Sequence, residues 1–296
     1  EMISGDWSSD VCSSDLLHQA LAQSHFHWGL SAWGLYALVG GALAYSSYRR
    51  GRVTLISSTF RSLFGEKTEG IAGRLIDMMA IIATLFGTAA TLGLSAIQVG
   101  QGVQIISGAS EITNNILIAI IAILTIGFII SSVSGVSKGI RYLSNLNISL
   151  TLGLVLFVFI TGPTLFLLNL IPSSVLEYGS EFLSMAGKSL SWGEETIEFQ
   201  AGWTAFYWAW WIAWTPFVGM FIARISRGRT LREFALITMA IPSFILILAF
   251  TIFGGTAIAM NRENVDGFDG SSSKEQVLFD MFSNLPLYSI TPFILI

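Results

Sequence analysis

Long apolar segments separated by short polar linkers run through the sequence from residue 28 onward. A helix that crosses a membrane needs about 20 predominantly apolar residues. Six segments meet this length, and a seventh starts near the end of the chain: 28–47, 76–101, 115–133, 148–171, 203–223, 235–260 and 286–296. The pattern therefore predicts an all-α polytopic membrane protein.

Two other stretches do not fit the spanning pattern. Residues 173–190 mix apolar and polar positions at helical spacing, which is typical of a helix lying on the membrane surface. Residues 1–16 are rich in serine and aspartate, repeat "SSD" and are similar to a translated sequencing adapter. We expect them to be a non-native leader, with a natural disordered terminus as the alternative. Because the last apolar run continues to the final residue, we expect 17–296 to be a fragment of a longer protein.

Composition narrows the function. Charged residues make up 11% of the chain and hydrophobic residues 53%, whereas a soluble domain carries about 25% charged residues. The histidines and the single cysteine all lie near the start, at His18, His25, His27 and Cys12. The spans hold no Cys/His cluster and no central Asp or Glu, so we expect no catalytic residues, no organic cofactor and no carboxylate proton relay. A lipid bilayer is the expected surrounding, and nucleic acid is not an expected partner.

Charge in the linkers predicts the orientation. Basic residues follow the first, third and fifth spans, where they make up 12 of the 15 in the chain, and acidic residues gather on the other side. The positive-inside rule places the basic linkers in the cytoplasm. The first span then enters from outside.

Aromatic residues crowd the fifth span, where "WTAFYWAWWIAWTPF" holds five tryptophans. An indole face attracts a quaternary ammonium group by roughly 0.5–2 kcal/mol, so several rings hold a cation without a carboxylate. The first span adds Trp28, Trp33 and Tyr36, which lie on one face of a continuous helix. The alternative is an aromatic belt or simple packing, although belts lie at the ends of spans. Pro216 ends "AWTP" and predicts a broken helix, a feature of transporter sites.

Together the segments resemble one known family. "WTAFYWAWWIAWTPFVGMFIARISRGRTLREF", "HWGLSAWGLYALVGGALAY", "IIATLFGTAATLGLSAIQVG" and "SGVSKGIRYLSNLN" are similar to consecutive segments of the betaine/carnitine/choline transporter (BCCT) family. The resemblance implies a LeuT-like inverted-repeat fold of twelve spans, of which this chain holds about spans four to ten. It also implies secondary transport of glycine betaine, choline or carnitine, usually by a homotrimer in the bacterial inner membrane.

The resemblance also implies roles for individual residues. It assigns Trp28, Trp33, Tyr36 and Trp211 to the substrate cage, and Trp210 and Trp214 to the route toward the cytoplasm. It assigns a sodium site to Thr84, Thr88 and Phe217. The alternative for each threonine is a hydrogen bond to a carbonyl of its own helix.

Several alternatives stay open at the level of sequence. The family also includes proton-linked transporters and sodium-independent exchangers, and a channel or a non-transporting sensor is a further alternative. Arg141 fits a cytoplasmic basic linker, or the arginine that replaces a bound cation in exchangers. The sequence leaves open the choice among substrates and among coupling ions.

Overall fold

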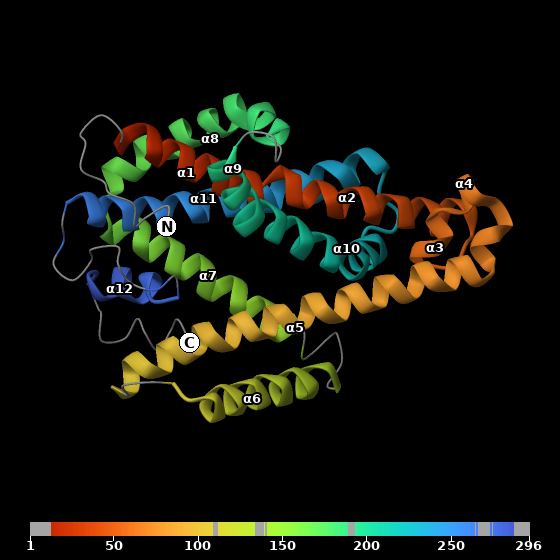
Figure 1. Cartoon of the computed structure of the whole chain (residues 1–296), viewed down its shortest axis with the longest axis horizontal. Coiled ribbons are helices and arrows are strands. Elements are labelled where there is room, and N and C mark those ends of the chain that lie inside the picture. Colours follow the sequence, from red (N-terminus) through yellow and green to blue (C-terminus); the bar gives the residue numbers. More distant parts are fainter. Residues whose placement is uncertain are drawn as a thin grey trace. The chain divides into compact units, whose positions relative to one another are not determined.

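The computed structural model describes residues 13–108, 112–133, 139, 141–188, 193–263, 265, 273 and 275–286. Within them the secondary structure is helical, which confirms the predicted all-α class. The α-helices are α1 (Ser13–Trp28), α2 (Leu30–Ala44), α3 (Ile56–Thr59), α4 (Arg61–Phe64), α5 (Ile71–Ser107), α6 (Asn114–Val133), α7 (Arg141–Thr161), α8 (Thr164–Gly187), α9 (Glu194–Phe199), α10 (Phe206–Ile225), α11 (Leu231–Arg262) and α12 (Val277–Ser283) (Figure 1). Short 3₁₀ and π segments, η1 (Tyr45–Arg49), η2 (Gly65–Glu69) and η5 (Gln200–Ala205), connect some of them.

Among the described residues, four helices are long and apolar enough to cross a membrane, judged by length and composition. They are Ile71–Ser107, Asn114–Ser131, Arg141–Thr161 and Leu231–Arg262. At most 28% of any of their apolar windows is buried inside the protein, so their side chains need an apolar surrounding. α2, in the expected first span, has only 15 residues. A single residue separates it from α1, so the two helices follow each other almost without interruption.

The helix boundaries around the fourth expected span differ from the prediction. We expected a span over 148–171 and a separate surface helix over 173–190. Instead α7 ends at Thr161, and α8 runs through both regions from Thr164 to Gly187. The break falls at Gly162 and Pro163, because proline has no N–H to extend α7 and is well suited to the start of a helix. Arg141 is the exposed first residue of α7. The expected span over 286–296 lies almost entirely outside the described residues.

The chain divides into two compact units, which are described separately. The first unit contains Glu1–His18, Thr91–Ser174 and Ala249–Ile296. In it α8 and α11 touch closely: a side chain at Gly255 would meet the Leu170 and Leu167 side chains at 2.7 and 2.9 Å. One turn away, the Ser174 and Thr251 hydroxyls are 3.3 Å apart. Small and hydroxyl-bearing residues thus join two apolar helices, as is usual in membrane proteins.

The second unit contains Gln19–Ala90 and Val175–Leu248. Its core has two parts. One joins α1 to α8 and α11 through Ala22, Phe26, Tyr178, Met185 and Ile247. The other joins α2 to α10 through Ala32, Tyr36 and Trp211, with further aromatic residues packed around them. This second part holds the candidate site.

Orientation in the membrane is testable by cysteine labelling. The loop charges place Ser226, after α10, in the cytoplasm and Asn114, at the start of α6, outside. With Cys12 replaced by serine, we expect Ser226→Cys to react with an impermeant thiol reagent only from the cytoplasmic side, and Asn114→Cys only from the outer side. The reverse pattern in whole cells and inverted vesicles would show that the orientation is wrong.

Candidate functional site

A one-residue break at Gly29 separates α1 from α2. Its backbone angles, φ −91° and ψ −134°, are not helical. A side chain at this position would have its Cβ 2.4 Å from the His25 carbonyl oxygen and 3.3 Å from the Tyr178 hydroxyl, so only glycine fits without a shift. The sequence predicted one continuous helix here. Trp28 therefore ends one helix, while Trp33 and Tyr36 belong to the next, and a single helical wheel does not relate the three rings.

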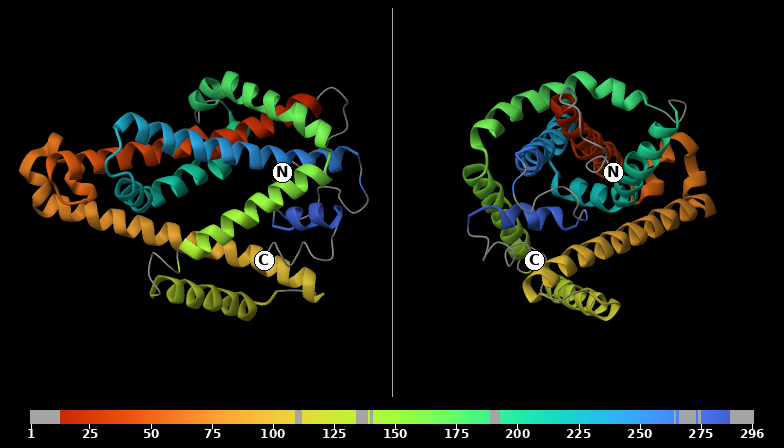
Figure 2. Two further views of the ribbon diagram at one scale, coloured as in Figure 1. Left: turned by 180° about the vertical axis from the view of Figure 1, so that it is seen from behind. Right: turned by 60° about the vertical axis from the view of Figure 1, so that its left-hand side comes forward.

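Glycines bring α2 and α10 into backbone contact below this break. A Cβ at Gly219 would lie 3.2 Å from the Gly40 nitrogen, and a Cβ at Gly40 would lie 3.2 Å from the Gly219 carbonyl oxygen. His27 contacts Thr204 near the start of the two segments, and Gly40 contacts Gly219 further along both. The two segments therefore run parallel. The loop charges require the same arrangement, because both segments are expected to run from outside to inside. Both views in Figure 2 show the two helices side by side.

The Gly219 contact provides a stability prediction. We expect Gly219→Val to lower the free energy of unfolding by about 1–3 kcal/mol, because the new side chain overlaps the α2 backbone. Its melting temperature in detergent should fall, whereas Gly93→Val should have little effect, since nothing lies within 4 Å of a Cβ at Gly93. Equal melting temperatures for the two variants would contradict the observed helix contact.

Three rings from three segments meet at Trp211. The Trp28 and Trp211 ring centroids are 4.9 Å apart with perpendicular planes, and the Tyr36 and Trp211 centroids are 5.8 Å apart at 83°. Trp33 extends the set, with its centroid 5.5 Å from that of Tyr36. Tyr36 and Trp211 are almost fully buried. The structure therefore brings together all four residues that were assigned to the substrate cage.

The two flanking tryptophans lie on the same helix as Trp211. Trp210 stacks beside Trp211, with centroids 6.1 Å apart and planes 15° apart, and Trp28 lies 5.9 Å from it. Trp214 is packed against the same cluster, and its ring centroid is 5.9 Å from that of Phe217. These positions form a row of rings along α10 that begins at the cluster and continues toward Phe217.

Backbone and histidine contacts fix the orientation of the central ring. Trp211 Nε1 donates a 2.8 Å hydrogen bond to the His27 carbonyl oxygen, next to the break at Gly29. The buried His27 ring has its Nε2 3.0 Å from the Thr204 hydroxyl and stacks on Tyr207 at 5.0 Å. His27, Thr204 and Tyr207 were not predicted from the sequence to belong to this site. The only hint in the sequence was that His27 precedes Trp28, and this position alone does not identify Thr204 as the hydrogen-bond partner of the histidine.

The helix around Pro216 is intact, contrary to the prediction of a break. α10 runs without interruption from Phe206 to Ile225. Proline removes one helical donor, and neighbouring groups often compensate in membrane helices. Pro216 removes the N–H that would reach the Ile212 carbonyl oxygen, and one turn of regular helix continues beside it, where the Thr215 hydroxyl donates a 2.6 Å hydrogen bond to the Trp211 carbonyl oxygen. The irregular segment lies instead at η5, a π-helical stretch before α10.

The residues assigned to sodium lie on α5 and α10, which approach closely at Gly87. A Cβ at Gly87 would lie 3.0 Å from the Ala213 Cβ. There the Thr84 hydroxyl is 2.9 Å from the Ala80 carbonyl oxygen in its own helix and 3.3 Å from the Ala213 carbonyl oxygen in α10. The exposed Thr88 hydroxyl donates to the Thr84 carbonyl oxygen at 2.7 Å. Both threonines thus make the bonds within the helix that formed the alternative interpretation, and Thr84 also reaches α10.

Helices, exposed apolar surfaces and a cluster of uncharged aromatic rings define a polytopic membrane protein. The chain belongs to the BCCT family, the betaine/carnitine/choline family of transporters, whose profile matches residues 9–296. The match begins inside the expected leader over 1–16.

Three relatives illustrate the similarity. The chain is 40% identical over 97% of its length to an uncharacterized transporter of Haemophilus influenzae, and covers 44% of that protein. It is 38% identical over 96% of its length to the glycine betaine transporter OpuD of Bacillus subtilis, covering 55% of it. It is 43% identical over 81% of its length to the high-affinity choline transport protein of Escherichia coli, covering 35% of it. The chain thus spans about half the length of these relatives, or less.

Proposed function

We propose that this chain is part of a secondary active transporter that takes up quaternary-ammonium or related zwitterionic solutes, such as glycine betaine, choline or carnitine, across a bacterial plasma membrane. The observation that supports this most directly is the meeting of Trp28, Tyr36 and Trp211 around one buried point. The rings carry no charge, and a trimethylammonium group needs none when aromatic faces surround it. The names of the relatives in Bacillus subtilis and Escherichia coli support the same class of substrate.

The ring geometry suggests how a cation enters the cluster. In a perpendicular pair the positive edge of one ring points at the negative face of the other. The edge of the first ring thus lies over the face of the second ring, at the place where a bound ammonium group would lie. Binding then exchanges ring–ring contacts for cation–ring contacts, so the Trp28–Trp211 pair at 4.9 Å has to separate. The break at Gly29 places a non-helical residue directly beside Trp28, where a small change in the backbone moves this ring relative to α2.

Transport itself separates this proposal from a channel or a sensor. The experiment measures uptake of labelled glycine betaine, choline and carnitine into proteoliposomes that contain the full-length protein, with and without an ion gradient. Saturable uptake that accumulates substrate against its gradient supports a secondary transporter. Binding without uptake would support a sensor, and uptake that only equilibrates the substrate would support a channel.

Sodium is the proposed coupling ion. It prefers oxygen ligands, and the Thr84 hydroxyl and the Ala213 carbonyl supply two of them at the α5–α10 contact. Proton-linked transport and sodium-independent exchange are the alternatives within the family. Replacing Arg141 by glutamine should leave ion dependence unchanged if Arg141 is a linker residue, whereas newly acquired sodium dependence would indicate an exchanger. The family resemblance also implies a homotrimer, which the mass of the purified protein in detergent tests.

A further inference from the structure

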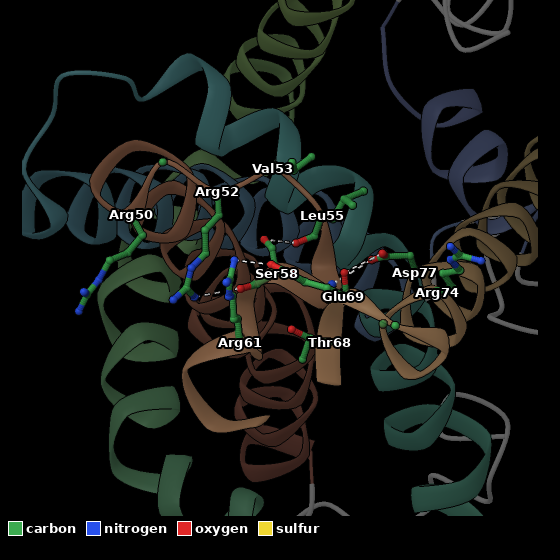
Figure 3. A pocket seen from close by; sticks show the side chains of 14 residues that line it. Arg50, Arg52, Val53, Leu55, Ser58, Arg61, Thr68, Glu69, Arg74 and Asp77 are labelled. Carbon is green, nitrogen blue, oxygen red and sulfur yellow. Dashed lines mark hydrogen bonds and ion pairs between the residues drawn. The ribbon is translucent and has the colours of Figure 1, made fainter. Parts of the chain in front are cut away.

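A second site lies at the far end of α2 from the aromatic cluster, in the second unit. The short segments between α2 and α5 fold around a cavity of about 790 Å³. Four arginines line it, Arg50, Arg52, Arg61 and Arg74, and the acidic residues in its lining are Glu69 and Asp77 (Figure 3). The loop charges place this end on the cytoplasmic side. The proposed transport function does not use these residues.

Both carboxylates of the cavity already have partners. Asp77 accepts hydrogen bonds from the Ser57 N–H at 2.9 Å and from the Ser57 hydroxyl at 2.7 Å, and so ties α3 to α5. Glu69 forms an ion pair with Arg61. Four guanidinium groups therefore face two carboxylates, and the excess positive charge is not neutralised among the described residues.

Arg52 and Arg61 provide the donors for an anion. Arg52 Nη1 donates a 3.3 Å hydrogen bond to the Ser58 carbonyl oxygen, which leaves most of its five N–H groups available. In Figure 3 the Arg52 and Arg61 side chains lie on the same side of the cavity, while Arg50 extends away and Arg74 lies beside Asp77 on the opposite side. Arg61 is already paired with Glu69, so a phosphate group beside Arg52 would share Arg61 with this carboxylate through the guanidinium N–H groups that the ion pair does not use.

The start of α5 adds a second source of positive potential. This 37-residue helix begins at Ile71, and Gly70 and Gly73 line the cavity. A Cβ at Gly73 would lie 1.7 Å from the Thr68 carbonyl oxygen, so glycine is required for η2 to fold against the first turn of α5. Free N–H groups at a helix N-terminus favour anions such as phosphate.

We propose that this cavity binds a phosphate group, through Arg52 and Arg61 with support from the N-terminus of α5. Guanidinium forks match phosphate oxygens in pairs. The phosphate belongs to a lipid headgroup or to a soluble phosphate compound of the cytoplasm. Val53 and Leu55 in the lining are 70% and 43% exposed, which gives the acyl part of a lipid an apolar contact.

The test uses the purified full-length protein and two phosphate probes. In one arm, native mass spectrometry counts the phosphatidylglycerol retained after transfer from mixed phosphatidylglycerol–phosphatidylcholine nanodiscs. In the other arm, calorimetry measures the binding of pyrophosphate. The variants are Arg52→Gln, which removes the charge, and Arg52→Lys, which keeps the charge without the fork. The matched control is Arg232→Gln, an exposed arginine of α11 that lies outside the cavity.

We expect Arg52→Gln to reduce binding of at least one probe about tenfold, Arg52→Lys to reduce it less, and Arg232→Gln to leave it unchanged. Loss of retained phosphatidylglycerol alone identifies a lipid site, and loss of pyrophosphate binding identifies a soluble phosphate site. The proposal is overturned if neither probe binds, or if Arg232→Gln lowers binding as much as Arg52→Gln, since the basic surface then acts only through its total charge. If Arg52→Gln does not fold, the test compares phosphate binding by Arg52→Lys and by Arg232→Gln, and the proposal requires weaker binding by Arg52→Lys.

Discussion

Replacing Trp211 by alanine is expected to weaken glycine betaine binding about 5- to 30-fold, which corresponds to the loss of about 1–2 kcal/mol of cation–ring attraction. The substitution removes the ring that contacts both Trp28 and Tyr36, so the remaining rings no longer surround one point. It also leaves the His27 carbonyl oxygen without the indole donor. Trp211→Phe keeps a ring face and should bind with an affinity between that of alanine and that of tryptophan. Isothermal titration of the full-length protein measures the difference.

The matched control for Trp211→Ala is Phe221→Ala. Phe221 lies on the same helix, is 53% exposed and is outside the aromatic cluster. This variant should bind betaine with unchanged affinity, which separates loss of the cage from general damage to α10. Unchanged affinity for Trp28→Ala, Trp33→Ala and Trp211→Ala alike would show that the substrate binds elsewhere.

The sequence was sufficient for the class of the protein and for the four rings at the centre of the cluster. Apolar length predicted membrane helices, and the density of rings in "WAWWIAW" with Trp28, Trp33 and Tyr36 predicted which residues share a site. The structure confirms the all-α class, and the family profile confirms the resemblance. The structure places the rings together, but the binding of a cation by them stays a prediction.

Features that depend on a single backbone contact were not predictable from periodicity. At the break, a side chain on Gly29 would meet the Tyr178 hydroxyl, which belongs to a part of the chain distant in sequence. Pro216 was expected to break α10, yet Pro163 is the proline that separates two helices. Gly162 and Pro163, the two residue types that disfavour a helix most, stand together at that break, whereas Pro216 lies between Trp214 and Phe217, whose rings are in contact. The sequence showed the arginines of the cavity only as basic residues of a cytoplasmic linker. It did not predict the cavity, because the cavity forms when α3, α4 and η2 fold onto α5.

Removing both threonine hydroxyls of the α5–α10 contact is expected to abolish the dependence of betaine binding on sodium. The Thr84 hydroxyl lies 3.3 Å from the Ala213 carbonyl oxygen, two residues from Trp211 along α10. In the proposed site, a sodium ion held by these two oxygens replaces the hydrogen bond that joins α5 to α10 beside the cluster. Sodium and betaine then raise each other's affinity by the same factor, because linkage between two binding equilibria is reciprocal. A coupling of 1–3 kcal/mol corresponds to roughly 5- to 150-fold.

The measurement compares betaine affinity in sodium chloride and in potassium chloride at equal ionic strength, for the full-length protein and for Thr84→Ala/Thr88→Ala. The unmodified protein should bind betaine more tightly in sodium, and the double variant should bind equally in both salts with the affinity seen in potassium. Thr91→Ala, on the same helix beyond Thr88, is the control and should keep the sodium effect. Phe217→Ala should weaken the effect only in part, because its ring is half exposed and supplies no oxygen ligand. If the double variant keeps the sodium dependence of the unmodified protein, coupling occurs at another site, and Thr84 and Thr88 serve only their own helix through the carbonyls of Ala80 and Thr84.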